Sequence, residues 1–597
     1  MKRGDISHWN DIDSCYNLLF FAQLINELLF DFSIPSNRIS TLNSHYLCLD
    51  ALSAIYEIEY NGVPEGTLKP IMEELYSELQ KDPVFDKEVA PMSFFVKVQD
   101  GKHKICNNVA EMNFFDLKRT ANSLKKVFFE NNSYYESTKN KIIDIVKKNE
   151  TEKQQELFRL TKSILTDLMN SGYSIKYLYT VMNQVFWNPQ TDINSPDRIQ
   201  DFFDCFTWDY HNFVVVFKVK KDKDSKIIKY IDGLDLQKEI EIETNSIEGK
   251  NFLRINKDEF FLQIEEKAKD PFTASENARK LLENNTAVYR LFDHEYKYKI
   301  WTEPCGIFDE NGEFYKYMLS KRPVQHIKTP SEKQIIESVG VANKAMSKIG
   351  NDWDYQDYIS LLSAIRFHSH SLNSYAEENQ LLDLWAIFET LLDIRNKHTS
   401  DRIQQICILL VPLLKRKYLF SLFDQLAGDI RNYDEGMFAR IVEDATDKKD
   451  VVQKVCEFVL LPEMEFYRDI ELAKMVDFPL LRERIRYYND KLSTPKLVHQ
   501  YVEKHADRVR WQVMRIYRNR NLIVHNGDSM PYLSLLIENL HSYVDDFLAY
   551  TIHSLANGNN IESMCQEVYI AECKWNERFA KSKDPITRNQ IKEMLSI

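Results

Sequence analysis

The stretch VRWQVMRIYRNRNLIVHN, residues 509–526, decides how the C-terminal part of this chain folds. Its apolar side chains recur at steps of four and three residues, which is the spacing of one helical face. The stripe consists of Val509, Val513, Ile516, Arg520 and Ile523. A guanidinium on an apolar stripe is costly unless it is paired or turned toward a pocket. Arg520 is therefore a candidate functional residue.

The residues after this stretch predict where the helix ends and the next one begins. Asn526 and Gly527 both tolerate the left-handed conformation of a helix C-cap. Asp528 or Ser529 is expected to cap the following helix, with Pro531 in its first turn. That helix is predicted from apolar side chains at helical spacing: Leu533, Ile537, Leu540, Val544, Phe547, Thr551 and Leu555.

Three side chains near the predicted helix end suit the cleavage of a phosphodiester. Asn521 and His525 are four residues apart and so share a helix face. His525 lies in the last turn, where the helix dipole favours a protonated imidazole. A histidine can move the proton while Arg520 neutralises charge on the phosphate oxygens. RNA supplies its own 2′-OH as nucleophile, so we predict catalytic Arg520, Asn521 and His525 with no metal and no cofactor.

A basic zone surrounds these residues in an otherwise acidic chain. Residues 481–525 contain eleven Lys or Arg and four acidic side chains, whereas the whole chain has a net charge of −13. Arg508 and Arg515 share a face with Trp511, which combines charge with an aromatic surface for stacking. Together with Arg518 they are the predicted substrate-binding residues. For any single one of them, a solvated helix face is an equally good interpretation.

Glu389 is the predicted supporting residue. It falls on an apolar stripe with Leu381 and Trp385, and a carboxylate there needs a partner. We hypothesise that it pairs with Arg520 and holds the guanidinium in position. Arg395 or Arg402 would serve equally well as its partner.

The chain is too long for a single core, and its pattern predicts a mainly α (α+β) protein with three regions. Residues 1–187 are expected to be helical, with helices near 14–32, 113–129, 151–169 and 175–187. After a linker at 188–197, residues 200–325 form a mixed region with strands at 213–217, 227–231 and 239–243. A hairpin turning at Asn311-Gly312 joins 307–308 to 314–317. After a boundary at 322–330, residues 333–597 are helical.

Composition excludes several classes of protein. Only 15 glycines occur, and no glycine-rich phosphate loop is present, which argues against P-loop, kinase and Rossmann proteins. The nine cysteines contain no Cys-x-x-Cys pair, which argues against a disulfide framework or zinc ribbon. The longest apolar run, 406–414, is too short to span a bilayer. The first residues do not resemble a secretory signal, so a cytoplasmic location without membrane contact is expected.

The sequence Arg520-Asn521-Leu522-Ile523-Val524-His525 resembles the Arg-x4–6-His motif of the HEPN superfamily, in its Arg-Asn-x-x-x-His form. The region from LLDLWAIFE, residues 381–389, to about 556 is most similar to Apea-like HEPN domains of bacterial anti-phage and abortive-infection proteins. The resemblance implies a helical bundle that forms a homodimer with two motifs across one cleft. It also implies metal-independent cleavage of RNA to 2′,3′-cyclic phosphate ends.

The expected function is therefore that of an anti-phage endoribonuclease that cleaves cellular RNA, with tRNA as one candidate. Residues 1–330 carry no resemblance and are expected to sense a phage-derived trigger or to bind a regulatory partner. Two alternatives stay open. The domain could be a non-catalytic RNA- or protein-binding module, or the chain could be the toxin of a toxin–antitoxin pair.

Overall fold

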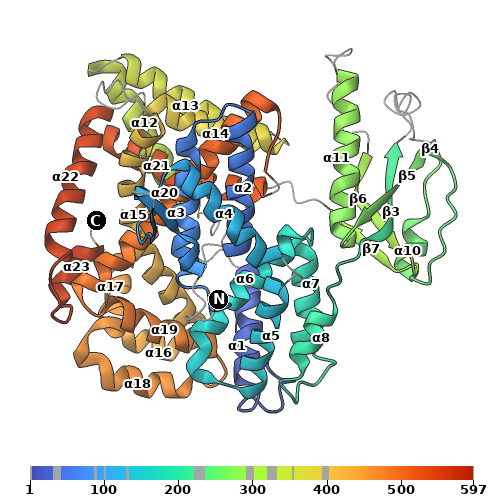
Figure 1. Ribbon diagram of the computed structural model, residues 1–597, viewed down its shortest axis with the longest axis horizontal. Helices are drawn as coiled ribbons and strands as arrows, with labels where there is room; N and C mark the ends of the chain where they lie inside the picture. Colours follow the sequence, from blue (N-terminus) through green and yellow to red (C-terminus); the bar gives the residue numbers. More distant parts are fainter. Residues whose placement is uncertain are drawn as a thin grey trace. The chain divides into compact units, whose positions relative to one another are not determined.

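The computed structural model describes residues 3–30, 42–85, 91–99, 102–129, 133–220, 236–290, 301–318, 332–352, 355–374, 376–392, 402–530 and 532–595 (Figure 1). The described chain is mainly helical with a small antiparallel sheet, which confirms the mainly α (α+β) class. Its contacts divide it into two compact units. Unit 1 comprises Met1–Thr166, Asp192–Pro196 and Arg322–Ile597, and unit 2 comprises Asp167–Thr191 and Asp197–Lys321.

Unit 1 is built from helices at both ends of the sequence. The N-terminal ones are α1 (Tyr16–Phe30), α2 (Ser44–Tyr60), α3 (Leu68–Leu79), α4 (Phe114–Phe129), α5 (Ser133–Lys148) and α6 (Gln154–Asn170), whose last residues belong to unit 2. The C-terminal ones are α12 (Glu332–Asp352), α13 (Tyr355–Asn373), α14 (Glu377–Leu391), α15 (Arg402–Tyr433), α16 (Glu435–Ile441), α17 (Lys448–Leu460), α18 (Glu465–Lys474), α19 (Pro479–Leu492), α20 (Pro495–Asn526), α21 (Leu533–Ala556), α22 (Ile561–Phe579) and α23 (Arg588–Leu595). The expected helices at 113–129 and 151–169 correspond to α4 and α6.

One hydrophobic core holds the two ends of the sequence together. Leu47 of α2, Trp385 of α14, Val513 of α20 and Phe547 of α21 all belong to the same buried cluster. Residues 1–166 therefore close on the C-terminal helices and do not form a separate body, unlike the consecutive regions expected from the sequence.

A buried ion pair adds to this connection. Arg484 of α19 donates to both carboxylate oxygens of Glu27 of α1, at 2.7 and 2.5 Å. The Glu27 side chain is fully buried and that of Arg484 is 5% exposed. Removing either partner would leave an uncompensated buried charge, so α1 is fixed against α19.

Unit 1 also contains a short hairpin within the region expected to be mostly helical. Strand β1 (Val96–Gln99) pairs antiparallel with β2 (Lys102–Ile105). Val98 and Ile105 are exposed, so the hairpin lacks the strong apolar alternation that predicts strands. The described residues of unit 1 also form five 3-10 turns: Glu65–Thr67, Pro91–Phe94, Val109–Glu111, Thr151–Lys153 and Pro462–Met464.

Unit 2 is an antiparallel sheet of five strands with helices. The strand order is β4-β5-β3-β6-β7. The strands are β3 (His211–Lys220), β4 (Leu236–Gln237), β5 (Glu259–Ala268), β6 (Trp301–Asp309) and β7 (Phe314–Tyr317), and the helices are α7 (Ile175–Phe186), α8 (Arg198–Asp204), α10 (Ile247–Phe252) and α11 (Pro271–Arg290). Helix α11 covers the sheet, burying Ala274, Ala278 and Leu282 against strand side chains (Figure 1).

The structure bears out part of the strand and turn predictions in this unit. The strand at 213–217 lies within β3, and the hairpin at Asn311-Gly312 joins β6 to β7. Gly312 has a φ of +76°, and a Cβ there would collide with the carbonyl of Glu243. The helix at 175–187 is α7.

One strand prediction is wrong. Residues 239–243 belong to no strand. Ile240 and Ile242 pack against a core cluster of the sheet that contains Val216, Phe261 and Phe308. The observed neighbours of β3 are β5, which was not predicted, and β6. The predicted strand at 227–231 and the boundary at 322–330 lie outside the described residues.

Candidate active site on helix α20

Helix α20 carries the motif residues, and its ends are fixed by local interactions. Thr494 caps its start, where its hydroxyl accepts from the Leu497 N–H at 3.3 Å. Gly527 ends the helix with a φ of +66°, and its N–H donates to the Ile523 carbonyl at 3.1 Å. The predicted Asn-Gly helix end is therefore confirmed, and His525 lies in the last turn.

The helix that follows begins later than predicted. Its N-cap is Tyr532, which makes no side-chain capping bond, so neither Asp528 nor Ser529 caps α21. The Asn519 carboxamide instead accepts from the Met530 N–H at 3.1 Å, which fixes the connection between α20 and α21. The predicted apolar stripe of α21 is buried along its length.

Arg520 forms the ion pair that was hypothesised from the sequence. Its Nη2 lies 3.5 Å from Glu389 Oε1 on α14. The same Glu389 oxygen accepts from Trp385 Nε1 at 3.0 Å, while Arg520 Nη1 donates to Asn521 Oδ1 at 3.3 Å. The side chains of Arg520 and Glu389 are 26% and 21% exposed. The guanidinium is thus held at the surface of the bundle, where a ligand can still reach it.

His525 is exposed at the C-terminal end of α20. In the part of the chain that the structure describes, no hydrogen bond occupies its ring. It lies five residues from Arg520, which places the two about 140° apart around the helix and about 7.5 Å apart along it. One copy of the helix therefore does not direct both groups to the same point.

Arg515 and Arg518, predicted to bind substrate, lie in a buried ionic network. Arg518 donates to Asp50 Oδ1 at 2.6 Å and to Glu57 Oε2 at 2.9 Å, both on α2. Arg515 pairs with Glu74 of α3, and its Nε is 3.5 Å from Asp50 Oδ2. Both arginine side chains are at most 5% exposed. They bind the N-terminal helices to α20 and are not presented to a substrate.

Charge compensation in this network is visible at Asp50. Burial acts to raise the pKa of its carboxyl, but Arg518 and Arg515 outweigh it and hold the pKa below its ordinary value. The Tyr532 hydroxyl also donates to Asp50 Oδ1, at 3.0 Å. Asp50 is therefore ionised in the core of unit 1.

Arg508 and Trp511, the other predicted substrate-binding residues, lie earlier on α20. Both are half-buried and line a cavity in unit 1. Arg508 is twelve residues from Arg520, or about 18 Å along the helix axis. They are therefore separate from the motif residues in the monomer.

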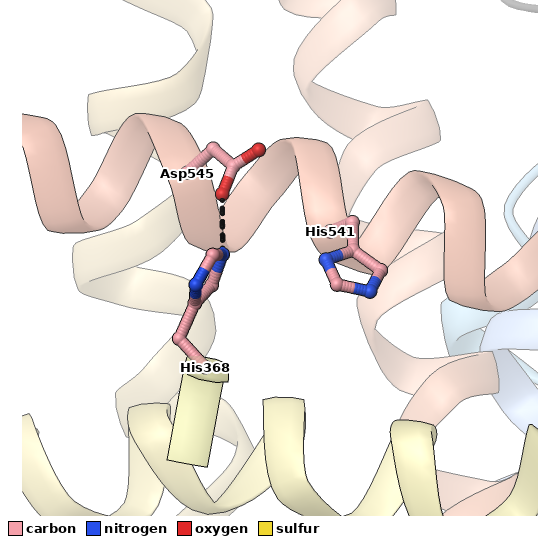
Figure 2. Close-up of side chains that lie close together, drawn as sticks. All are labelled: His368, His541 and Asp545. Carbon is pink, nitrogen blue, oxygen red and sulfur yellow. Dashed lines mark hydrogen bonds and ion pairs between the residues drawn. The ribbon is translucent and has the colours of Figure 1, made fainter. Parts of the chain in front are cut away.

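A cluster on α13 and α21 offers metal-binding atoms that the sequence analysis did not combine (Figure 2). His368 Nε2 lies 2.9 Å from Asp545 Oδ1, and His541 lies one helical turn before Asp545. The potential ligand atoms all lie within 4.8 Å of one another. Two histidines and a carboxylate suit a transition metal. The i,i+4 spacing of His541 and Asp545 on a predicted helix was the sequence pattern that could have indicated it.

The chain matches no protein-family model, no curated protein and no solved structure. Among the described helices, none is both long and apolar enough to cross a membrane.

Proposed function

We propose that this protein is a metal-independent endoribonuclease of the HEPN type, with Arg520, Asn521 and His525 as its catalytic residues. The observation that supports this most directly is the arrangement of Arg520. Its guanidinium is oriented by Glu389 and Asn521 at the bundle surface, and the exposed imidazole of His525 lies five residues further along the same helix. A fixed cation and an accessible acid–base group suit charge stabilisation and proton transfer at a phosphodiester when both reach the same phosphate.

The proposed reaction uses the RNA's own 2′-OH. A histidine accepts the 2′-OH proton as the 2′ oxygen forms a bond to the adjacent phosphorus. The bond from phosphorus to the 5′ oxygen breaks, and that oxygen receives a proton from a protonated histidine. The products are a 2′,3′-cyclic phosphate and a free 5′-OH. Arg520 stabilises the negative charge on the non-bridging oxygens, and Asn521 orients the phosphate or the guanidinium.

A homodimer is part of this proposal. One copy supplies one motif histidine, His525, whereas the reaction needs one group to accept a proton and another to donate one. A symmetric pair would place two Arg520 and two His525 side chains at one cleft. The wide angle between Arg520 and His525 on a single helix supports a site shared by two copies.

The biological role that we propose is that of a cytoplasmic anti-phage effector that cleaves cellular RNA, with tRNA as one candidate. Such an enzyme must be restrained until infection, and residues 1–330 would respond to a phage-derived trigger or to a regulatory partner. The buried pairs from Arg515 and Arg518 to α2 and α3 support this, because a change in the N-terminal helices would act directly on the motif helix.

The experiment that tests this function is cleavage of total bacterial RNA in EDTA by the full-length protein. Wild type should cut, and His525→Ala and Arg520→Ala should lose at least about a hundredfold in rate. His553→Ala and Arg578→Ala are matched controls at exposed positions of α21 and α22. The cut ends would identify the RNA target.

Three other results would contradict the proposal. Intact RNA binding without cleavage, by a fully dimeric protein with or without phage lysate, would favour a binding module. Cleavage that requires a divalent cation and is lost in His541→Ala would move the chemistry to the His368 cluster. Toxicity that a separately encoded protein suppresses would favour a toxin–antitoxin pair.

A further inference from the structure

Unit 1 contains a cavity of about 490 Å³ that the proposed nuclease chemistry does not use. Most of its lining comes from α6, α19 and α20 and from the end of α3, and α1, α2, α5 and α15 contribute single residues. A volume of this size is typical of sites that bind small molecules. The cavity includes Arg508 and Trp511 but none of the motif residues at the end of α20.

Two cations in the cavity wall have no counterion bonded to them. Among the described residues, the side-chain ammonium of Lys162 on α6 makes no hydrogen bond or ion pair, and neither does the guanidinium of Arg508 on α20. Arg508 Nε is a buried nitrogen without a hydrogen-bond partner. Both side chains are half-buried, and a cation that is partly removed from water is stabilised by a counterion. Their presence together in one cavity therefore indicates a site for an anion.

Each of the four acidic side chains of the lining is bonded to another partner, although the charge of Glu78 acts on both Lys162 and Arg508. The pairs are Asp82 with the Tyr134 hydroxyl at 2.7 Å, Glu483 with Gln155 Nε2 at 2.8 Å, Asp507 with Arg510 Nη1 at 3.4 Å and Glu78 with Lys81 Nζ at 3.7 Å. Lys504 and Lys491 are further cations on the lining.

The aromatic side chains of the wall provide a surface for a planar ring. Tyr487 and Trp511 are half-buried and line the cavity from α19 and α20. Tyr487 packs edge-on against Tyr501 at a centroid distance of 6.4 Å, and Tyr501 stacks with Tyr418 at 6.0 Å. Aromatic faces beside cations are the combination by which proteins hold a base and its phosphate.

We propose that this cavity binds a nucleotide, with its phosphate at Lys162 and Arg508 and its base against Tyr487 and Trp511. A single nucleotide fits the volume of the cavity, and the cations of the lining outnumber its four carboxylates. The proposal does not depend on the nuclease function.

The protonation of Lys162 supports this assignment. Burial, followed by the positive charge of Arg508, lowers the pKa of Lys162 to about 8, against an opposing effect of Glu78. The surroundings of Lys162 therefore disfavour its charged form in the free protein. A bound phosphate would favour that charged form.

The test is calorimetric titration of the full-length protein with ATP, GTP, CTP, UTP, their monophosphates, the four nucleosides and inorganic phosphate. We expect at least one nucleotide to bind, and its nucleoside to bind at least tenfold more weakly. Lys162→Met and Arg508→Met should each weaken nucleotide binding at least tenfold. Lys574→Met, at an exposed position of α22, should bind like wild type.

One further variant and one fluorescence measurement test the site without relying on half-buried residues alone. Lys504→Met changes an exposed lysine of the lining, so it should weaken binding without disturbing the fold. A Trp511-dependent fluorescence change on binding, lost in Trp511→Phe, would place the base. No binding by wild type at millimolar nucleotide would overturn the proposal. So would binding that survives both Lys162→Met and Arg508→Met, or binding of single-stranded RNA alone.

Discussion

Arg520 Nη2 lies 3.5 Å from Glu389 Oε1, across the contact between α20 and α14. The carboxylate is itself fixed by Trp385, whose indole donates to the same oxygen. An arginine has many rotamers, and a partner that is oriented in this way reduces their number. Glu389 is therefore a positioning residue for the proposed catalytic arginine.

Replacing Glu389 by Gln should lower RNA cleavage by about tenfold, because a displaced catalytic group loses much of its effect. We expect the loss in kcat rather than in KM, with an unchanged melting temperature. In the double variant Glu389→Gln/Arg520→Lys the two losses should not add, since the residues are in contact. Glu593→Gln removes the partner of exposed Arg578 and is the matched control. Additive losses would separate Glu389 from the function of Arg520.

Replacing Arg518 by Met should destabilise unit 1 by about 3–5 kcal/mol, since Asp50 and Glu57 would stay buried without their cation. The measurement is the free energy of unfolding in urea. Arg578→Met breaks an ion pair at the surface and should change stability by less than about 1 kcal/mol. If the two substitutions lowered the free energy of unfolding equally, the buried network would stabilise unit 1 no more than a surface ion pair does.

Sequence reasoning predicted the features of the site that depend on neighbouring residues. The end of α20 follows from Asn526-Gly527, and the apolar stripes of α20 and α21 follow from helical spacing. The Arg520–Glu389 pair could also be predicted from the sequence, because each charge interrupts an apolar stripe and so requires a partner. These inferences use only local rules of helix formation and burial.

The interactions of Arg515 and Arg518 could not be predicted in this way. The carboxylate that both approach, Asp50, is more than 460 residues away along the chain. Local patterns contain no information on which distant helix will supply a carboxylate, so basic residues on α20 were interpreted as an RNA-binding surface. The cavity could not be predicted from the sequence for the same reason. Lys162 and Arg508 line one cavity only because α6 packs near α20 in the folded chain.

Replacing Lys162 by Met should stabilise the nucleotide-free protein. The pKa of this lysine falls from an ordinary 10.5 to about 8 in the folded state. The unfolded chain therefore binds more protons between pH 8 and 10.5, and wild-type stability from this group rises with pH across that window. The variant should be more stable by about 2–3 kcal/mol at pH 7. The difference should shrink toward pH 10.5, as urea unfolding at several pH values can show.

Lys574→Met, whose lysine is exposed, should have nearly the stability of wild type at every pH tested. A destabilised Lys162→Met protein would mean that the ammonium is compensated in the free state. That outcome would remove the charge argument for an anion site.

Nucleotide affinity should decrease as pH rises above 8. The charged groups that act on Lys162 are Arg508 of α20 and Glu78 of α3, and the free lysine titrates near pH 8. A bound phosphate raises that pKa, so above pH 8 binding must be accompanied by proton uptake. The affinity should therefore fall by up to about tenfold per pH unit until the pKa of the complex is reached. Titrations between pH 7 and 10 in buffers of different ionisation enthalpy would measure both the affinity and the proton uptake.

In Lys162→Met the remaining affinity should hardly change between pH 7 and 9, because the group that titrates in this window is absent. The nucleotide phosphate is fully ionised throughout most of the range and cannot mimic the effect. A wild-type affinity that stays constant across pH 8, or a variant that keeps the wild-type pH dependence, would show that the phosphate does not contact Lys162.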